Sequence, residues 1–288
     1  MAKTGDGKPK QGPGKARRER AVAMKEIEAD VTALIERLES ETKDVELYGP
    51  LVEQEECPIC FVPMPRSDRE SVYMECCGQT VCGGCTHAAS LISKKLKKSD
   101  PCAFCRSEIL QDDKALIAQY RSRAEKNDVD AIKALANRYD SGQEGLPKDE
   151  VMVLRLYLRA AALGNLKAIV FLANRFREGD DVPQDTVVAM QLATTTAKKG
   201  HLGSYSLLGI IHRLRGDVEN AAKCWIFAAR AGHSLCMEAL RIYKVGGAKV
   251  VSDDHLEAIE KDYQEAAKLE WSKEREAFKK HMSVRYPI

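Results

Sequence analysis

Eight of the ten cysteines lie in one short stretch of the chain, and their spacing is typical of metal ligands. Three pairs have two intervening residues and one pair is adjacent: Cys57 and Cys60, Cys82 and Cys85, Cys102 and Cys105, and Cys76 and Cys77. Two thiolates three positions apart on a tight turn can reach one ion, and zinc takes four such ligands in a tetrahedron. Eight thiolates therefore predict two closed sites with no position left for water, which indicates structural rather than catalytic metal.

The cysteines also indicate a compartment. Residues 1–14 contain no apolar run of the kind found in a secretory signal. Thiols in the cytosol or nucleus stay reduced, so we expect an intracellular protein, cytoplasmic or nuclear, whose cysteines bind metal instead of forming disulfides or a redox pair. A stretch this short has little core of its own, so the metal would supply most of its folding free energy.

The residues around these cysteines resemble a RING finger. The matching strings are C-P-I-C at 57–60, C-G-x-T-V-C-x-x-C at 77–85 and C-x-F-C-R at 102–106. The resemblance implies a cross-braced domain over residues 55–108 with two Zn²⁺ ions. Its implied ligands interleave, with Cys57, Cys60, Cys82 and Cys85 on one zinc and Cys76, Cys77, Cys102 and Cys105 on the other.

One position departs from the common RING pattern. Gln79 stands where the usual histidine ligand would be, and glutamine is a poor zinc ligand. The adjacent Cys76 and Cys77 supply the missing thiolate in an all-cysteine variant. The alternative is that one of these two cysteines is not a ligand and that His87 takes its place.

The resemblance also implies an activity, that of a RING-type ubiquitin-protein ligase without a covalent intermediate. Such a domain docks a ubiquitin-charged conjugating enzyme and holds the ubiquitin in a reactive pose, which is catalysis by positioning. Ile59, Pro101 and Phe104 match the apolar docking features, although Pro101 precedes its cysteine instead of following it. Arg106 matches the arginine that bridges conjugating enzyme and ubiquitin. The alternative is a non-enzymatic, zinc-stabilised scaffold for protein–protein interaction.

Composition excludes some partners. Of the 288 residues, 44% are hydrophobic and 31% charged, with a net charge of +2, as in an ordinary soluble protein. No apolar stretch approaches the roughly 18 residues of a membrane span. Nucleic-acid binding through a basic tail is a weaker hypothesis, because aromatic and basic residues are not interleaved.

The chain begins with a basic segment, residues 1–20, which predicts a disordered tail. Residues 21–48 predict an amphipathic helix, because apolar residues recur every seven positions, at Met24, Val31, Leu38 and Val45. Three heptads are few for a stable coiled coil. This helix either pairs with a second copy in a homodimer or packs on the cysteine-rich region of its own chain.

Beyond the cysteines the pattern changes to a repeat. The frame A-x3-L-x3-Y/F-x2-G occurs at 131–142 and at 168–179, and a degenerate copy begins at Ser204. Glycines that end a second helix lie 36 and 32 residues apart, at Gly164, Gly200 and Gly232. Fixed periods of this length indicate stacked helix pairs. These units resemble Sel-1-like repeats, relatives of the tetratricopeptide solenoid, and predict a solenoid over 112–247 that binds a protein substrate or peptide.

Two further helices are expected. Residues 85–98 predict a helix inside the cysteine-rich region, with Leu91, Ile92 and Leu96 as its apolar face. Residues 252–283 predict one long helix that caps the solenoid. The expected fold is therefore mainly α: a small RING-like domain followed by an α/α solenoid, with an N-terminal helix. The substrate, the conjugating enzyme and the oligomeric state are not readable from the sequence.

Overall fold

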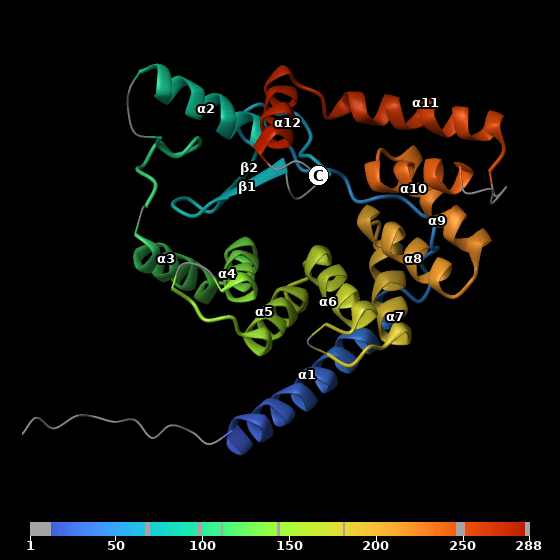
Figure 1. The fold of residues 1–288 in the computed structure, drawn as a ribbon, viewed down its shortest axis with the longest axis horizontal. Helices are drawn as coiled ribbons and strands as arrows, with labels where there is room; N and C mark the ends of the chain where they lie inside the picture. The colour runs from blue at the N-terminus through green and yellow to red at the C-terminus, as the bar shows by residue number, and fades with distance from the viewer. Residues whose placement is uncertain are drawn as a thin grey trace, which may run out of the picture.

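The computed structural model describes residues 13–66, 70–96, 100–110, 112–142, 145–180, 182–245 and 251–285 (Figure 1). The described part is mainly helical. Residues 1–12 of the expected disordered tail lie outside it, but the prediction is wrong for residues 13–20, which belong to helix α1. None of the helices described there is long and apolar enough to cross a membrane. The elements are α1 (Pro13–Glu41), β1 (Ser71–Met74), β2 (Gln79–Cys82), α2 (Gly83–Lys95), α3 (Asp113–Glu125), α4 (Val129–Ser141), α5 (Glu150–Ala162), α6 (Leu166–Glu178), α7 (Thr186–Lys198), α8 (Leu202–Leu214), α9 (Val218–Arg230), α10 (Ser234–Val245), α11 (Asp253–Leu269) and α12 (Lys273–Arg285).

Helices α3 to α10 form the solenoid, in which each helix packs on the next. The helices can approach closely because small alanines occupy the contact positions, where their side chains are fully buried: Ala131, Ala168, Ala189, Ala221 and Ala228. Asp149 and Asp185 accept backbone N–H groups at the starts of α5 and α7, as N-caps do. The predicted helical repeat solenoid is therefore confirmed.

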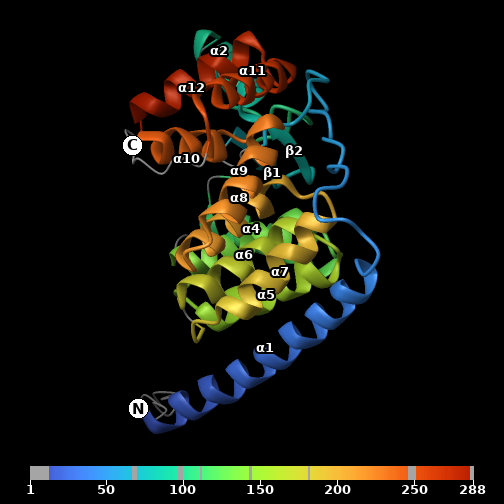
Figure 2. The same ribbon diagram turned by 90° about the vertical axis from the view of Figure 1, so that its right-hand side faces the viewer.

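Helix α1 lies along the outside of the repeats and contacts α5 and α7 (Figure 2). It begins earlier and ends earlier than the expected 21–48 helix. Its apolar stripe is buried in the solenoid core, with Ile27, Val31, Leu34 and Leu38 each 7% exposed or less. Arg37 also donates to the carbonyl oxygen of Ala161 over 3.2 Å. The expectation that α1 packs on the cysteine-rich region is wrong, because the outer faces of α5 and α7 supply the apolar surface that it needs.

The cysteine-rich region forms a small unit, here called the cysteine module (residues 55–66, 70–96 and 100–110). Strands β1 and β2 pair antiparallel, with Val72 opposite Val81, and α2 follows directly after Cys82. A core that includes Met74 and Val81 lies between the cysteines. The apolar face expected on α2 is not buried: Leu91, Ile92 and Leu96 are 44%, 60% and 60% exposed.

The C-terminal region differs from the single expected helix. Helix α11, capped by Ser252, packs on α9 and α10 and covers the end of the solenoid. The chain then breaks at residues 270–272, and α12 turns back to pack on α2 of the cysteine module (Figure 1). Ser272 caps α12 by accepting the N–H of Arg275 over 3.2 Å. At the same point Glu270 forms an ion pair with Arg66 of the cysteine module, at 2.9 Å.

His233 caps α10 only while its ring is neutral, because its Nδ1 accepts the N–H of Cys236 over 3.4 Å. Burial, together with the nearby charge of Arg66, lowers the pKa of His233 to about 4. A ring with a lowered pKa contributes stability that is complete above its ordinary pKa of about 6.5 and is lost as the pH falls toward 4. We therefore expect acidification from pH 7.5 to 5 to cost about 1–2 kcal/mol through this ring.

Urea denaturation at the two pH values measures this loss. His233→Asn retains a capping side chain that does not titrate, so its loss of stability between pH 7.5 and 5 should be smaller than that of the wild type. Equal losses in the two proteins would exclude His233 as the source.

Candidate metal centres

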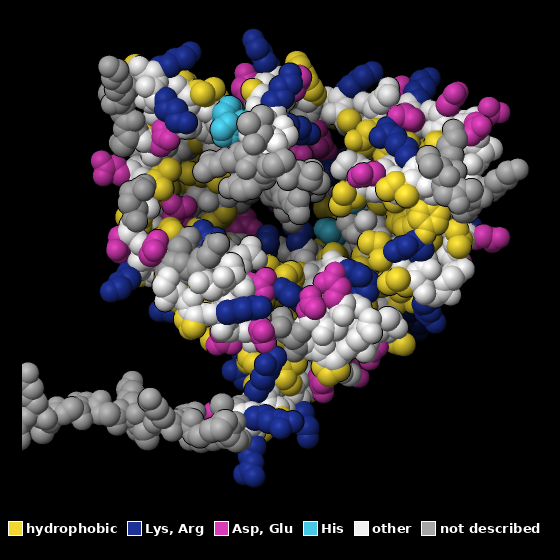
Figure 3. Space-filling model, in the orientation of Figure 1, with side chains coloured by type: hydrophobic (Ala, Val, Ile, Leu, Met, Phe, Trp, Pro, Cys, Tyr) yellow, Lys and Arg dark blue, Asp and Glu magenta, His cyan; other side chains and the backbone are white. Residues whose placement is uncertain are grey.

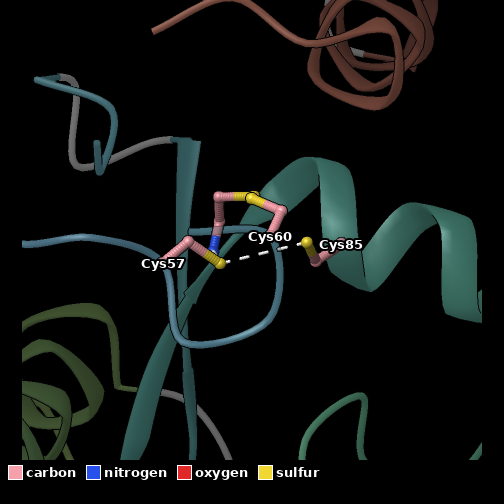
Figure 4. A group of neighbouring side chains, drawn as sticks. Cys57, Cys60 and Cys85 are labelled. Atoms are coloured by element: carbon pink, nitrogen blue, oxygen red, sulfur yellow. Dashed lines mark hydrogen bonds between the residues drawn. The ribbon is translucent and has the colours of Figure 1, made fainter. Parts of the chain in front are cut away.

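The fold gathers the eight clustered cysteines into two groups of four, and within each group every Sγ atom lies within 4.8 Å of the others. In the first group, the Sγ–Sγ distance is 3.9 Å for Cys57–Cys85 (Figure 4) and 3.9 Å for Cys60–Cys82. In the second, they are 3.5 Å for Cys76–Cys105 and 3.9 Å for Cys77–Cys102. A tetrahedral zinc with Zn–S bonds near 2.3 Å places its sulfurs about 3.8 Å apart. Each group could therefore hold one metal ion.

The groups are built from tight turns that also present backbone N–H groups to sulfur. The N–H groups of Phe104 and Cys105 both point at the sulfur of Cys102, each over 3.4 Å. In the first group the N–H of Cys82 points at the sulfur of Cys57, also over 3.4 Å. These hydrogen bonds favour the thiolate form, which is the form that binds metal.

The ionisation of the thiols is strongly perturbed. Burial raises the pKa of Cys57, but the N–H groups of Cys82, Cys60 and Ile59 outweigh it and bring this pKa down to about 7. Burial and the neighbouring Cys82 raise the pKa of Cys85. Four thiolates in one small volume oppose one another's ionisation, and a divalent cation removes that repulsion. The donor set therefore fits a soft divalent metal such as zinc.

Both Cys76 and Cys77 belong to the second group. Gln79 is exposed at the start of β2. His87, the alternative ligand, belongs to neither group: its ring lies against His281 and Phe278 of α12, with ring centroids 4.9 and 6.2 Å away. The placement of these side chains favours the all-cysteine arrangement.

The expected docking residues lie on the two cysteine turns. Ile59 is partly buried against the module's core, between Cys57 and Cys60. Pro101 pairs with Glu108 across the base of the other turn. Phe104 is 42% exposed, and Arg106 is exposed.

Arg106 has an equivalent in the first turn. Phe61 and Arg106 each follow the second cysteine of a C-x2-C pair, and both adopt left-handed backbone conformations with φ of 58° and 66°. Each N–H closes its turn by donating to the carbonyl of the first cysteine, over 2.8 Å to Cys57 and 3.1 Å to Cys102. The exposed side chains of Phe61 and Arg106 therefore start from matching positions on the two turns.

Sequence reasoning missed the residues that attach the module to the solenoid. Arg123 of α3 donates to the carbonyl oxygens of Glu75 and Cys76, over 2.6 and 2.8 Å. Tyr73 of β1 donates to Asp128, the N-cap of α4, over 2.7 Å. These contacts place the second cysteine group directly on the first end of the solenoid. No local motif marks Arg123 or Tyr73, because their partners lie about 50 residues away.

The repeats are matched by a known family model. Residues 129–165, 166–201 and 202–233 match the Sel1 repeat, so the chain carries Sel1 repeats after the cysteine module. Chitin synthase regulatory factor 4 of Schizosaccharomyces pombe is 30% identical over 105 residues, which make up 36% of this chain and only 17% of that protein. The matched segment thus spans less than a fifth of this curated relative.

Two solved structures are similar. One is a Sel1 repeat protein from Oxalobacter formigenes, with 27% identity and a TM-score of 0.44, covering 57% of this chain and 64% of that one. The other is a protective antigen of uropathogenic Escherichia coli strains with an SLR fold, with 24% identity and a TM-score of 0.44, covering 59% and 36%.

Proposed function

We propose that this chain, which joins a two-group cysteine module to a Sel1 repeat solenoid, is a RING-type ubiquitin-protein ligase. In this proposal the module binds two zinc ions and docks a ubiquitin-charged conjugating enzyme, and the repeats recruit the substrate. The observation that carries the proposal is the interleaving of the ligands. The first and third cysteine pairs form one group and the second and fourth form the other. Two pairs joined in sequence order would instead make two independent metal loops.

Exposed apolar side chains on the module support the docking role. Phe104 on one cysteine turn, Ile92 on α2 and Leu96 directly after α2 are 42–60% exposed. Large apolar side chains on a small surface unit are typical of protein–protein contact sites. Helix α12 packs against other positions of α2, Gly83 and Gly84 among them, so it leaves these three side chains uncovered.

The proposed role of Arg106 follows from its chemistry. A guanidinium has five donors in a rigid plane and a permanent charge, which suits hydrogen bonds to carbonyl groups on two proteins at once. The turn that ends at Arg106 is held by its own N–H and by the second cysteine group. The backbone that carries the Arg106 side chain would therefore be rigid.

The repeats supply the recruiting surface in this proposal. Sel1 repeats form a protein-interaction solenoid, and repeat arrays offer broad surfaces for partners. The face drawn in Figure 3 is hollowed between the cysteine module and the repeats, with charged side chains of both signs at its walls. A protein segment with both charges fits such a surface better than an apolar ligand does.

A zinc-stabilised scaffold without ligase activity is the second candidate. The observation that favours it is Pro101, which stands before Cys102 and pairs with Glu108 at the base of the turn. If the docking groove needs a proline after Cys102, this chain lacks that proline. In this case both the module and the repeats would serve only to hold partners together.

An autoubiquitination assay with a panel of conjugating enzymes separates the two candidates. Zinc content is first measured at two ions per chain, and the wild type is then compared with Arg106→Ala. We expect ubiquitin chains from the wild type and a loss of ten-fold or more in rate for the variant, since a transition-state contact worth about 1.4 kcal/mol changes the rate ten-fold.

Arg213→Ala, which removes an exposed arginine from α8, is the matched control and should retain the wild-type rate. No chains with any conjugating enzyme, at full zinc content, would favour the scaffold.

A further inference from the structure

Helix α12 carries a buried cation to the first cysteine group. Arg275 is only 3% exposed, although it belongs to a helix near the C-terminal end of the described chain. Its guanidinium donates to the carbonyl oxygens of Pro63, Val62 and Glu270, over 2.6, 3.1 and 2.9 Å. Its Nη2 also lies 3.9 Å from the sulfur of Cys60. Backbone oxygens thus hold the guanidinium of Arg275 in place, and its Nη2 faces the sulfur of Cys60.

Helix α12 packs against the first residues of α2, where two glycines allow a close approach. A Cβ atom on Gly83 would lie 2.4 Å from the ring of Phe278, and one on Gly84 would lie 2.7 Å from the backbone N of Arg275. Any larger residue at either position would push α12 away. These two glycines stand directly between the ligands Cys82 and Cys85, so the close approach takes place at the first cysteine group itself.

The negative charge of a zinc-loaded first cysteine group explains why a cation would lie beside it. Four thiolates around one Zn²⁺ carry a net charge of −2, and the first group is largely removed from water, with Cys57 and Cys82 at 0% and 1% exposure. A buried negative centre needs a nearby compensating charge or hydrogen-bond donors. The guanidinium of Arg275 provides both, because it is permanently charged and remains charged when buried.

We propose that Arg275 is the outer-shell cation of the Cys57, Cys60, Cys82 and Cys85 group, and that α12 completes this metal site. Metal retention in the first group then depends on a helix more than 200 residues away in sequence. The second group has a separate support, Arg123 of α3, which holds the carbonyl oxygens of Glu75 and Cys76. The proposal rests on metal occupancy of the cysteine groups, and it does not require ligase activity.

Alkylation of cysteines under a chelator, read by peptide mass spectrometry, tests this on the full-length zinc-loaded chain. Outer-shell changes weaken metal binding by about 10–100-fold. For Arg275→Met we therefore expect the cysteines of the first group to be alkylated at least ten-fold faster than in the wild type. The cysteines of the second group, which α3 supports separately, should be affected less. Arg275→Lys, which keeps the charge, should retain more protection of the first group than Arg275→Met.

Two controls separate a specific effect of Arg275 from loss of any charge on α12 and from global unfolding. Lys279→Met removes an exposed cation from the same helix, where Lys279 pairs with Glu70 at 3.1 Å, and should leave both groups protected. Cys224 and Cys236, buried in the solenoid at 1% and 0% exposure, report global unfolding in the same sample.

Unchanged protection of the first group in Arg275→Met would overturn the proposal, as would equal loss from both groups or simultaneous labelling of Cys224 and Cys236. If Arg275→Met and Arg275→Lys lost protection of the first group equally, the positive charge of Arg275 would have no part in retaining the metal. A wild type without bound zinc would refute the metal assignment itself, which is a different result.

Discussion

Replacing Cys102 with alanine is expected to release zinc and to unfold the cysteine module while the repeats stay helical. Cys102 is fully buried, and its sulfur belongs to the second group and accepts two backbone N–H groups. Structural zinc contributes about 10–16 kcal/mol in zinc-finger peptides, far more than a small hydrophobic core. Because the two groups interleave along the chain, loss of the second should also loosen the turns that build the first.

Zinc content by elemental analysis and amide exchange of residues 55–110 measure this effect. We expect fewer than two zinc ions per chain and loss of protection in β1, β2 and α2. Cys236→Ala is the control, since Cys236 is equally buried but lies in α10, outside both groups. A Cys102→Ala protein that keeps two zinc ions and a protected module would show that Cys102 is not a ligand.

Leu38→Ala is expected to destabilise the solenoid by about 2–5 kcal/mol, the usual cost of removing a buried leucine side chain. Leu38 is 1% exposed and lies in the same core cluster as the buried side chains of the repeats. Its loss would leave a cavity between α1 and the solenoid. Urea denaturation followed by helical circular dichroism measures the change in the free energy of unfolding.

Val45→Ala is the matched control for this prediction. Val45 continues the same seven-residue pattern but is 39% exposed, so its truncation should change the free energy of unfolding by about 0.5 kcal/mol or less. The apolar stripe of α1 is buried within one chain. Homodimerisation through α1 remains the alternative, and it would make the unfolding midpoint rise with protein concentration. A concentration-dependent midpoint would contradict the intramolecular role.

Local spacing was enough to predict that the clustered cysteines could hold metal ions, and to predict the repeats. Two cysteines separated by two residues reach one ion whatever the rest of the chain does, because a tight turn sets their distance. The helix pairs were equally readable, since an alanine-rich frame with a fixed period can be buried only by stacking on its neighbours. The N-caps Asp149 and Asp185 are likewise local, since each accepts from a backbone N–H within three residues.

The pairing of distant surfaces could not be read in this way. The seven-residue pattern of α1 shows that the helix buries an apolar stripe. Many apolar surfaces satisfy that requirement, and nothing in the pattern points to the outer faces of α5 and α7, where α1 packs. The C-terminal stripe predicted one helix because its periodicity continues through residues 270–272. At this break Glu270 pairs with Arg66, which lies about 200 residues earlier in the chain, so the contact carries no local signal.

The sequence by itself therefore determined the parts of this protein: eight clustered thiols with the spacing of metal ligands and an array of helix pairs with the period of Sel1 repeats. Only the tertiary structure decided how the parts close on one another, with Arg123 supporting one cysteine group and Arg275 the other. The physical reason is one of range. Turns and periods are set by neighbouring residues, whereas a buried guanidinium finds its place only when surfaces far apart in the chain fit together.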